Sequence, residues 1–165
     1  MQRLGKLKTL KLSVYIEADF AGEASTLKST TSYVLLLGSG IVQWHLKGQS
    51  ITASSRADAE FIASPSAIQK LVWLHQLVQE IIYSSLRVSM LFNNNQVSLS
   101  TFKDTAYKSH CKYISVRGHQ IREFIEDGKD VIIDYYYMDK MSADSVTKLL
   151  VAGKHVKCVR MYGLL

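Results

Sequence analysis

The chain has 165 residues, of which 47% are hydrophobic and 21% are charged, and its formal net charge is +6. This composition is typical of one globular domain, and no apolar run approaches the roughly 20 residues that a membrane helix requires. The basic start lacks the continuous apolar segment of a secretory signal, and two cysteines make no disulfide framework. We therefore expect a soluble intracellular protein, cytoplasmic or nuclear, without a membrane partner.

The positive charge favours a polyanionic partner, and nucleic acid is the obvious candidate. Lys and Arg are scattered along the chain rather than massed in one run, so a simple solubility surplus is the alternative interpretation. Charge alone does not distinguish nucleic-acid binding from a solubility surplus, whereas sequence motifs can.

Alternating apolar residues predict strands in the first third of the chain. Residues 11–16 alternate with period two, and residues 32–37 and 41–46 are two further strand-like runs. Gly38-Ser39-Gly40 separates these two runs and predicts a hairpin turn. A further extended run is expected at residues 49–53, after a turn at Lys47-Gly48.

A long amphipathic helix is predicted from Arg56 to about Tyr83. Ser55 is its candidate N-cap, and apolar residues recur at spacings of three and four beyond it. Pro65 lies inside this helix, where it lacks an amide proton and costs about 3 kcal/mol or introduces a kink. Glu60 is either an ordinary solvated helix acid or, if other acids converge on it, part of a site.

The second half of the chain predicts a mixed α/β order. A strand at residues 86–92 ends at the turn-forming run Asn93-Asn94-Asn95, and a short helix follows at residues 96–102. A helix is expected at residues 118–127, a strand at 130–137 and a helix at 142–150 with Ser142 as its cap, before a basic tail to Leu165.

Several short motifs occur along the chain in the same order as in one known protein family. They include Tyr15 to Gly22, Lys28 to Val34, Trp44, Ser55 to Ala63, Asn94-Asn95-Gln96, Ile121-Arg122-Glu123 and Ala143 to Lys148. Together they resemble the ribonuclease H domain at the end of copia-type retrotransposon Pol polyproteins. The resemblance implies a domain at residues 13–165 behind a basic lead-in at residues 1–12. It also implies ancestral fusion to a reverse transcriptase and, by ancestry, residence in a virus-like particle.

The same resemblance implies a fold, a reaction and a site. The fold is the mixed α/β ribonuclease H-like fold, a five-stranded mixed sheet with helices on both faces. The reaction is endonucleolytic hydrolysis of the RNA strand of an RNA:DNA hybrid by two Mg²⁺ ions, which prefer carboxylate ligands. The family's four catalytic positions fall on Glu17, Glu60, Asn94 and Asp144, with Glu17, Glu60 and Asp144 as the metal ligands. Asp19 and His119 are possible accessory residues.

Two of these four positions depart from the family's aspartates. Glu17 keeps the charge but is one methylene longer, at a site where a misplacement of about 1 Å can cost roughly 100-fold in rate. Asn94 replaces a carboxylate by a neutral amide. We therefore expect weakened metal binding and impaired cleavage; the alternative is an inactive remnant that binds nucleic acid or is merely folded.

Two other interpretations carry less support. A zinc site formed by His110, Cys111, His155 and Cys158 lacks the usual paired spacing. The run Tyr135-Tyr136-Tyr137 would suit base stacking, but alternate members of a strand face opposite sides, so at least one ring is expected in the core.

Overall fold

The computed structural model describes residues 10–82, 89–103, 131–137, 143–147 and 150–164. Five strands form one sheet in the order β3-β2-β1-β4-β5. Their bounds are β1 Leu12–Asp19, β2 Thr30–Leu37, β3 Gly40–Gly48, β4 Ser89–Asn93 and β5 Val131–Tyr135. The predicted helix at residues 118–127, along with His110, Cys111, His119 and Ser142, lies outside the described residues.

The sheet is mixed, as expected. Strands β1, β2 and β3 form an antiparallel meander, whereas β4 is parallel to β1 and β5 is parallel to β4. Gly38, with a φ of 64°, makes the tight turn between β2 and β3. Strand β1 therefore lies at the centre, with an antiparallel neighbour on one side and a parallel neighbour on the other.

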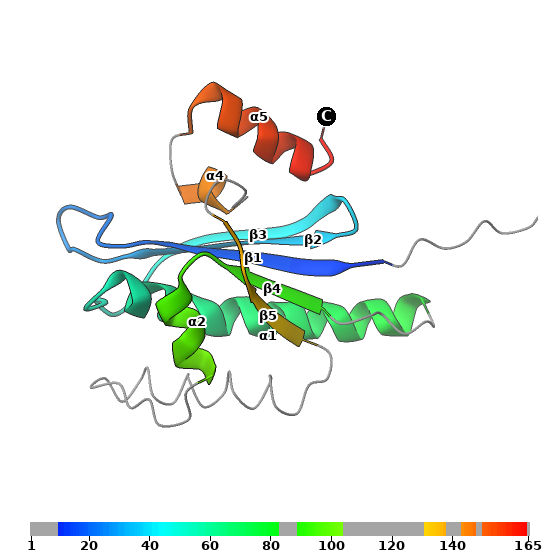
Figure 1. Ribbon diagram of the computed structural model, residues 1–165, viewed down its shortest axis with the longest axis horizontal. Helices are drawn as coiled ribbons and strands as arrows, with labels where there is room; N and C mark the ends of the chain where they lie inside the picture. Colours follow the sequence, from blue (N-terminus) through cyan, green and yellow to red (C-terminus); the bar gives the residue numbers. More distant parts are fainter. Residues whose placement is uncertain (1–9, 83–88, 104–130, 138–142, 148–149, 165) are drawn as a thin grey trace, which may run out of the picture.

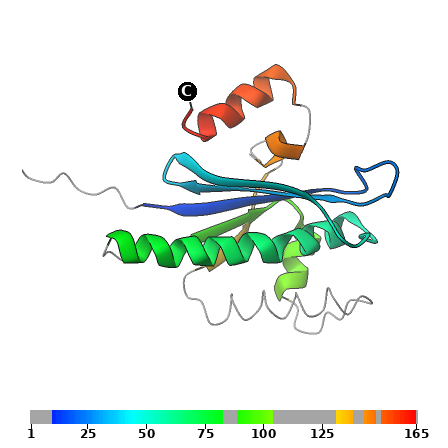
Figure 2. The same cartoon turned by 180° about the vertical axis from the view of Figure 1, so that it is seen from behind.

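Helices cover both faces of this sheet (Figure 1). The long helix α1 (Arg56–Ile82) lies along one face, and α2 (Gln96–Lys103) follows β4 on the same side. The short helix α4 (Asp144–Thr147) and helix α5 (Ala152–Met161) lie on the other side, which Figure 2 shows from behind. The mixed sheet with helices on both faces confirms the predicted fold class. None of the described helices is long and apolar enough to cross a lipid bilayer.

Each face of the sheet has its own apolar core because successive side chains of β1 point to opposite faces. Leu12, Val14, Ile16 and Ala18 belong to the larger core beneath α1, whereas Tyr15 belongs to the smaller core on the α5 side. In the smaller core Tyr15 stacks on Phe92 with ring centroids 5.0 Å apart. This alternation places the Glu17 side chain on the α4 and α5 side of the sheet and the Ala18 side chain on the α1 side.

Helix α1 begins where its cap predicts. The Ser55 hydroxyl accepts a hydrogen bond from the backbone amide of Asp58 at 3.1 Å, and the Ser55 carbonyl accepts one from the amide of Ala59. The helix then continues without interruption through Pro65 to Ile82. The buried hydroxyl of Ser64 donates to the carbonyl of Glu60 at 2.8 Å, one turn back. Glu60 thus sits in the second turn of a firmly started helix.

The extended run and the turn predicted just before α1 were wrong. Residues 49–53 are not a strand, because β3 itself continues to Gly48 and no turn occurs at Lys47-Gly48. Beyond it, the Gln49 side chain donates to Thr31 Oγ1 and to the carbonyl of Ala59, which holds the chain against α1 instead of another strand. The basic tail contains the helix α5, whose buried Cys158, together with Tyr162 just after the helix, packs into the smaller core.

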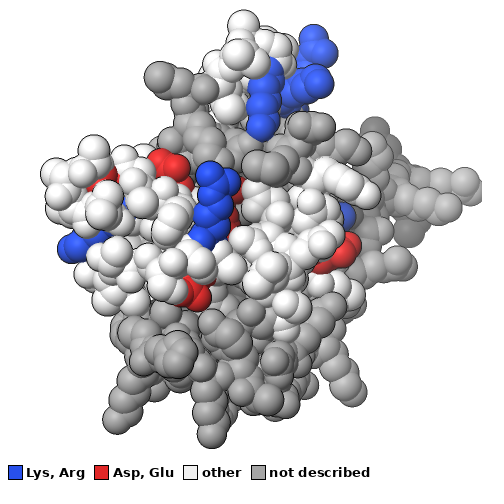
Figure 3. Space-filling model, turned by 60° about the vertical axis from the view of Figure 1, so that its left-hand side comes forward, with Lys and Arg blue, Asp and Glu red and all other residues white. Residues whose placement is uncertain are grey.

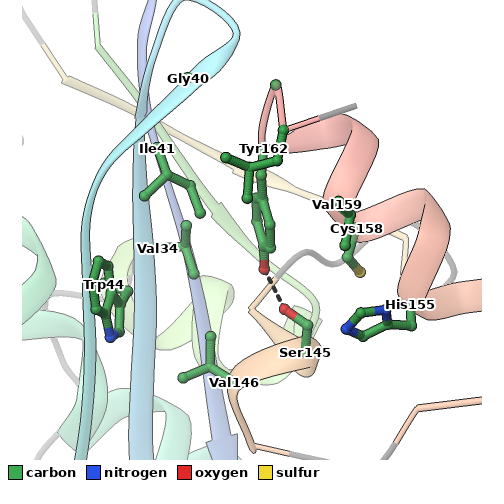
Figure 4. Close-up of a pocket in the computed structure, with 12 residues that line it drawn as sticks. Val34, Gly40, Ile41, Trp44, Ser145, Val146, His155, Cys158, Val159 and Tyr162 are labelled. Atoms are coloured by element: carbon green, nitrogen blue, oxygen red, sulfur yellow. Dashed lines mark hydrogen bonds between the residues drawn. The ribbon is translucent and has the colours of Figure 1, made fainter.

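Helix α5 closes over the β2–β3 hairpin. Figure 4 shows Tyr162 and the side chains of α5 facing Ile41 and Val34, with the Tyr162 hydroxyl hydrogen-bonded to the Ser145 hydroxyl. Between them lies an apolar groove of about 730 Å³, bordered by Trp44. Gly163 completes the closure: its φ is +69°, and a Cβ there would meet the Ser39 carbonyl oxygen at 2.5 Å.

Candidate functional site

A small polar pocket lies where β1 ends and α1 begins. It has a volume of about 190 Å³ and is lined by Glu17, Ala18, Asp19, Phe20, Arg56, Glu60, Asn94 and Asn95. Strands β1 and β4 are parallel, so their carboxyl ends, and the residues just after them, meet at the same edge of the sheet. The pocket therefore joins residues that are far apart in the chain.

Glu60 reaches this pocket from α1 and is held by two amide donors. Its Oε1 accepts a hydrogen bond from the backbone amide of Ala18 at 3.0 Å, and its Oε2 accepts one from Asn93 Nδ2 at 3.2 Å. The side chain is only 4% exposed, so Glu60 is not the ordinary solvated helix acid. It links α1 to β1 and to the end of β4.

Glu17 reaches the same pocket from β1 and is paired with Asn94. Asn94 Nδ2 donates to Glu17 Oε2 at 2.7 Å, and Glu17 is 3% exposed. A carboxylate can only accept hydrogen bonds, so the amide must turn its NH₂ group toward it. Asp19, two residues further along β1, lines the same pocket and places its Oδ2 close against Gly22.

The start of α4 lies against the backbone of Glu17. The Ser32 hydroxyl is 3.3 Å from the carbonyl oxygen of Glu17 and 3.4 Å from that of Ala143, the residue before α4. Ser32 is fully buried, and its register partner on β1 is Glu17. The backbone of Asp144 is therefore near the pocket, while its side chain and all of His119 lie outside what the structure describes.

The sequence did not predict that Arg56 and Asn93 belong to this site. Arg56 lines the pocket and brings a cation to a cluster of acids, and Figure 3 shows a face on which a basic side chain lies among acidic ones. Asn93 is fully buried and holds Glu60. The only signal for Asn93 in the sequence was the run of three asparagines, which predicts a turn and not a hydrogen bond to a helix 33 residues away.

The described side chains do not fit two magnesium ions. The carboxylates of Glu17, Asp19 and Glu60 line the pocket with the neutral amide of Asn94, and oxygens of Glu17 and Glu60 accept hydrogen bonds from amide NH groups. No group of three His, Cys, Asp or Glu side chains suited to a metal occurs within the part of the chain that the structure describes. Mg²⁺ prefers charged, hard oxygen ligands in near-octahedral geometry, and here amide donors compete with a cation for oxygens of Glu17 and Glu60.

Comparisons with known proteins find similar sequences among retrotransposon Pol polyproteins. No protein-family model matches the chain. It is 28% identical over 153 residues to the retrovirus-related Pol polyprotein from transposon TNT 1-94 of Nicotiana tabacum, and 26% identical over 147 residues to that from transposon RE1 of Arabidopsis thaliana. These matches cover 93% and 89% of the chain but only 11% and 10% of the polyproteins, so the chain spans about a tenth of their length.

Solved structures give the fold. RNase H1 from the halophilic archaeon Halobacterium salinarum NRC-1 superposes with a TM-score of 0.58, at 14% identity, over 82% of this chain and 92% of that one. LC11-RNase H1 in complex with an RNA/DNA hybrid superposes with a TM-score of 0.59, also at 14% identity and with the same coverage. The sheet order and these structures agree on a ribonuclease H-like fold, and the chain that adopts this fold is similar in sequence to retrotransposon Pol polyproteins.

Proposed function

We propose that this domain binds RNA:DNA hybrids and that its ability to hydrolyse their RNA strand is impaired. The observation that carries the proposal is the hydrogen bond of 2.7 Å from Asn94 to Glu17. It puts a neutral amide donor where the family resemblance implies a metal-binding aspartate. The amide satisfies the Glu17 carboxylate without a cation, so the negative charge that would attract divalent ions is reduced by one.

Nucleic-acid binding is supported by charge and by relationship. The chain carries a net charge of +6. The structural neighbour LC11-RNase H1 is known with a bound RNA/DNA hybrid. Phosphate contacts from Lys and Arg would give this domain affinity without requiring an intact metal centre.

The site's residues would then act as a structural cluster. Glu60 and Glu17 keep β1, β4 and α1 in register through their amide donors, and Arg56 offers a cation to a phosphate near the pocket. None of these roles requires a bound metal. When present in the family's form, two metals would supply the activated water and stabilise the leaving oxygen.

One pair of assays tests the proposal. Purified protein is incubated with a hybrid duplex labelled on the RNA strand and, separately, on the DNA strand, with Mg²⁺ or Mn²⁺ and with EDTA. We expect little metal-dependent cleavage of either strand. In parallel, the affinity for uncleaved hybrid should fall steeply with salt. Robust RNA cleavage would overturn the impairment, and an affinity that is unmeasurable at low salt or indifferent to salt would overturn the binding.

A further inference from the structure

A second pocket lies between the end of β3 and the middle of α1. It has a volume of about 360 Å³ and shares no lining residue with the pocket at Glu17. Its lining residues are Thr31, Tyr33, His45, Lys47, Gly48, Gln49, Ser50, Ile62, Ser66, Gln69 and Lys70. Two lysines and a histidine are among them, and no acidic residue is.

The absence of acids extends well beyond the lining. The sequence contains no Asp or Glu from Ala24 to Ala57, and none from Phe61 to Gln79. These stretches supply every residue of the pocket. The lysines therefore have no carboxylate partner within the segments that form the pocket, and the positive potential is available to a ligand.

The three basic groups act on one another. The pKa of His45 is lowered by its burial and by the charges of Lys47 and Lys70. Lys47 comes from β3 and Lys70 from the middle of α1, so the fold itself brings the two cations to one ring. His45 is fixed by stacking on the buried ring of Tyr33, with centroids 4.8 Å apart and planes inclined by 19°.

The floor of the pocket is rigidly built. The Gln49 side chain is 6% exposed, and its Nε2 donates to Thr31 Oγ1 at 3.0 Å and to the Ala59 carbonyl at 2.9 Å. These bonds tie the end of β3 to both β2 and α1. The hydroxyl groups of Thr31, Ser50 and Ser66 add neutral hydrogen-bonding groups around the cations.

We propose that this pocket, formed by His45, Lys47 and Lys70, binds a phosphate group of the nucleic-acid backbone, at a contact separate from the Glu17–Glu60–Asn94 cluster. The inference rests on the proposed nucleic-acid binding and names where on the surface the backbone is held. Glu60 and Lys70 are ten residues apart on one helix, which corresponds to roughly 15 Å along its axis. A nucleic acid engaged near the start of α1 would therefore have a second anchor further along the same helix.

Two double variants of equal charge test the site. Lys47→Gln with Lys70→Gln removes two cations from the pocket, and Lys154→Gln with Lys157→Gln removes two from α5 on the other face. Affinity for a short hybrid duplex is measured between 50 and 200 mM salt, about the range over which phosphate contacts weaken strongly. We expect the pocket variant to lose on the order of tenfold in affinity at low salt and to have a salt slope shallower by about two. The α5 variant should lose clearly less, and equal losses would show that only net charge matters.

A second measurement uses inorganic phosphate alone. Phosphate at constant ionic strength should raise the melting temperature of the wild type and of the α5 variant but not that of the pocket variant. By NMR it should also raise the pKa of His45, because a bound anion offsets the two lysines. An unchanged His45 together with equal thermal shifts in all three proteins would overturn the site. Hybrid binding that does not need the pocket would refute this inference and leave the proposed function standing. Phosphate binding by a protein that does not bind hybrid would refute the proposed function and leave the phosphate site standing.

Discussion

The amide of Asn94 donates to the carboxylate of Glu17 across 2.7 Å, linking two residues that are 77 positions apart. Each is partly or fully buried, and the pair joins the central strand to the turn after β4. An aspartate in place of Asn94 would face Glu17 with a second negative charge. The free energy of unfolding of residue 94 variants should therefore show how this residue pairs with Glu17.

We expect Asn94→Asp to destabilise the domain at neutral pH by about 2 kcal/mol in the absence of divalent ions. A hydrogen bond to a charged group is lost and two like charges are brought together. Millimolar Mg²⁺ should restore part of the stability, because a cation bound only by the folded state shifts unfolding by mass action. Urea unfolding with Mg²⁺, against NaCl of matched ionic strength, measures both effects.

Asn95→Asp is the matched control for this change. Asn95 lines the same pocket, but its Oδ1 caps α2 by accepting from the amide of Ser98 at 3.0 Å, a role that Asp fills equally well. It adds the same charge one residue away without facing Glu17. If Asn95→Asp shows the same loss and the same response to Mg²⁺, the pairing of Asn94 with Glu17 is not the cause.

Restoring both departed positions should restore some cleavage. In the double variant Glu17→Asp with Asn94→Asp, we expect Mg²⁺-dependent cutting of the RNA strand that exceeds that of either single variant. Ligands of one cluster act as a unit, so their effects are not additive. Initial rates on a hybrid labelled in either strand measure the recovery, and Pro65→Ser in the same background tests whether the proline restrains Glu60. A silent triple variant that folds and binds hybrid would place the site elsewhere.

Replacing Glu60 by Gln should cost stability even without any substrate. Glu60 accepts from two amide donors, and glutamine offers a single oxygen, so its NH₂ group must abut either the Ala18 amide or Asn93. We expect a loss of about 1–3 kcal/mol in the free energy of unfolding. Glu23→Gln is the comparison, since the exposed Glu23 also accepts from two groups, but these are hydroxyls of Ser25 and Thr26 that can rotate. Equal losses would contradict the account of Glu60.

Acidification should weaken the domain through His45. Because its pKa in the folded state lies below the ordinary value of about 6.5, the unfolded chain binds the proton more readily, and stability falls as the pH drops from about 7 through that value. The groups facing the ring are Lys47, Lys70 and Tyr33. His45→Gln should flatten the dependence of unfolding midpoint on pH between about 7 and 5. A dependence that the variant leaves unchanged would assign the titration to another group.

The main elements were predictable because their signals are local. The alternation in β1 and the cap at Ser55 specify a strand and a helix start within a few residues, and the structure has both. Helix α5 was missed because few of its residues are apolar and buried, although Lys154, Lys157 and Arg160 recur every three residues as on one helical side. The prediction of an extended run at residues 49–53 failed because the Gln49 side chain donates a hydrogen bond to α1, a long-range contact that no sequence pattern reveals.

The site was only partly accessible from sequence for the same reason. The family resemblance predicted that Glu17, Glu60, Asn94 and Asp144 form one site, and the structure brings the first three into one pocket. It could not predict that three successive asparagines do three different things. Asn93 holds Glu60, Asn94 holds Glu17, and Asn95 caps α2. Tertiary packing, and not residue type, decides which carboxylate faces which amide.

The contact between Gly163 and the β2–β3 turn has a consequence for how the domain is made. Tyr162 and Cys158 complete a core that also contains Tyr15 and Val34, which are synthesised more than a hundred residues earlier. At about 5–20 residues per second, the ribosome leaves that apolar face of the sheet uncovered for several seconds or more. During this interval the first hairpin and the exposed edge of β3 are open to pairing with other chains. Nascent chains stalled before residue 152 should therefore depend on chaperones, and those released after residue 163 should not.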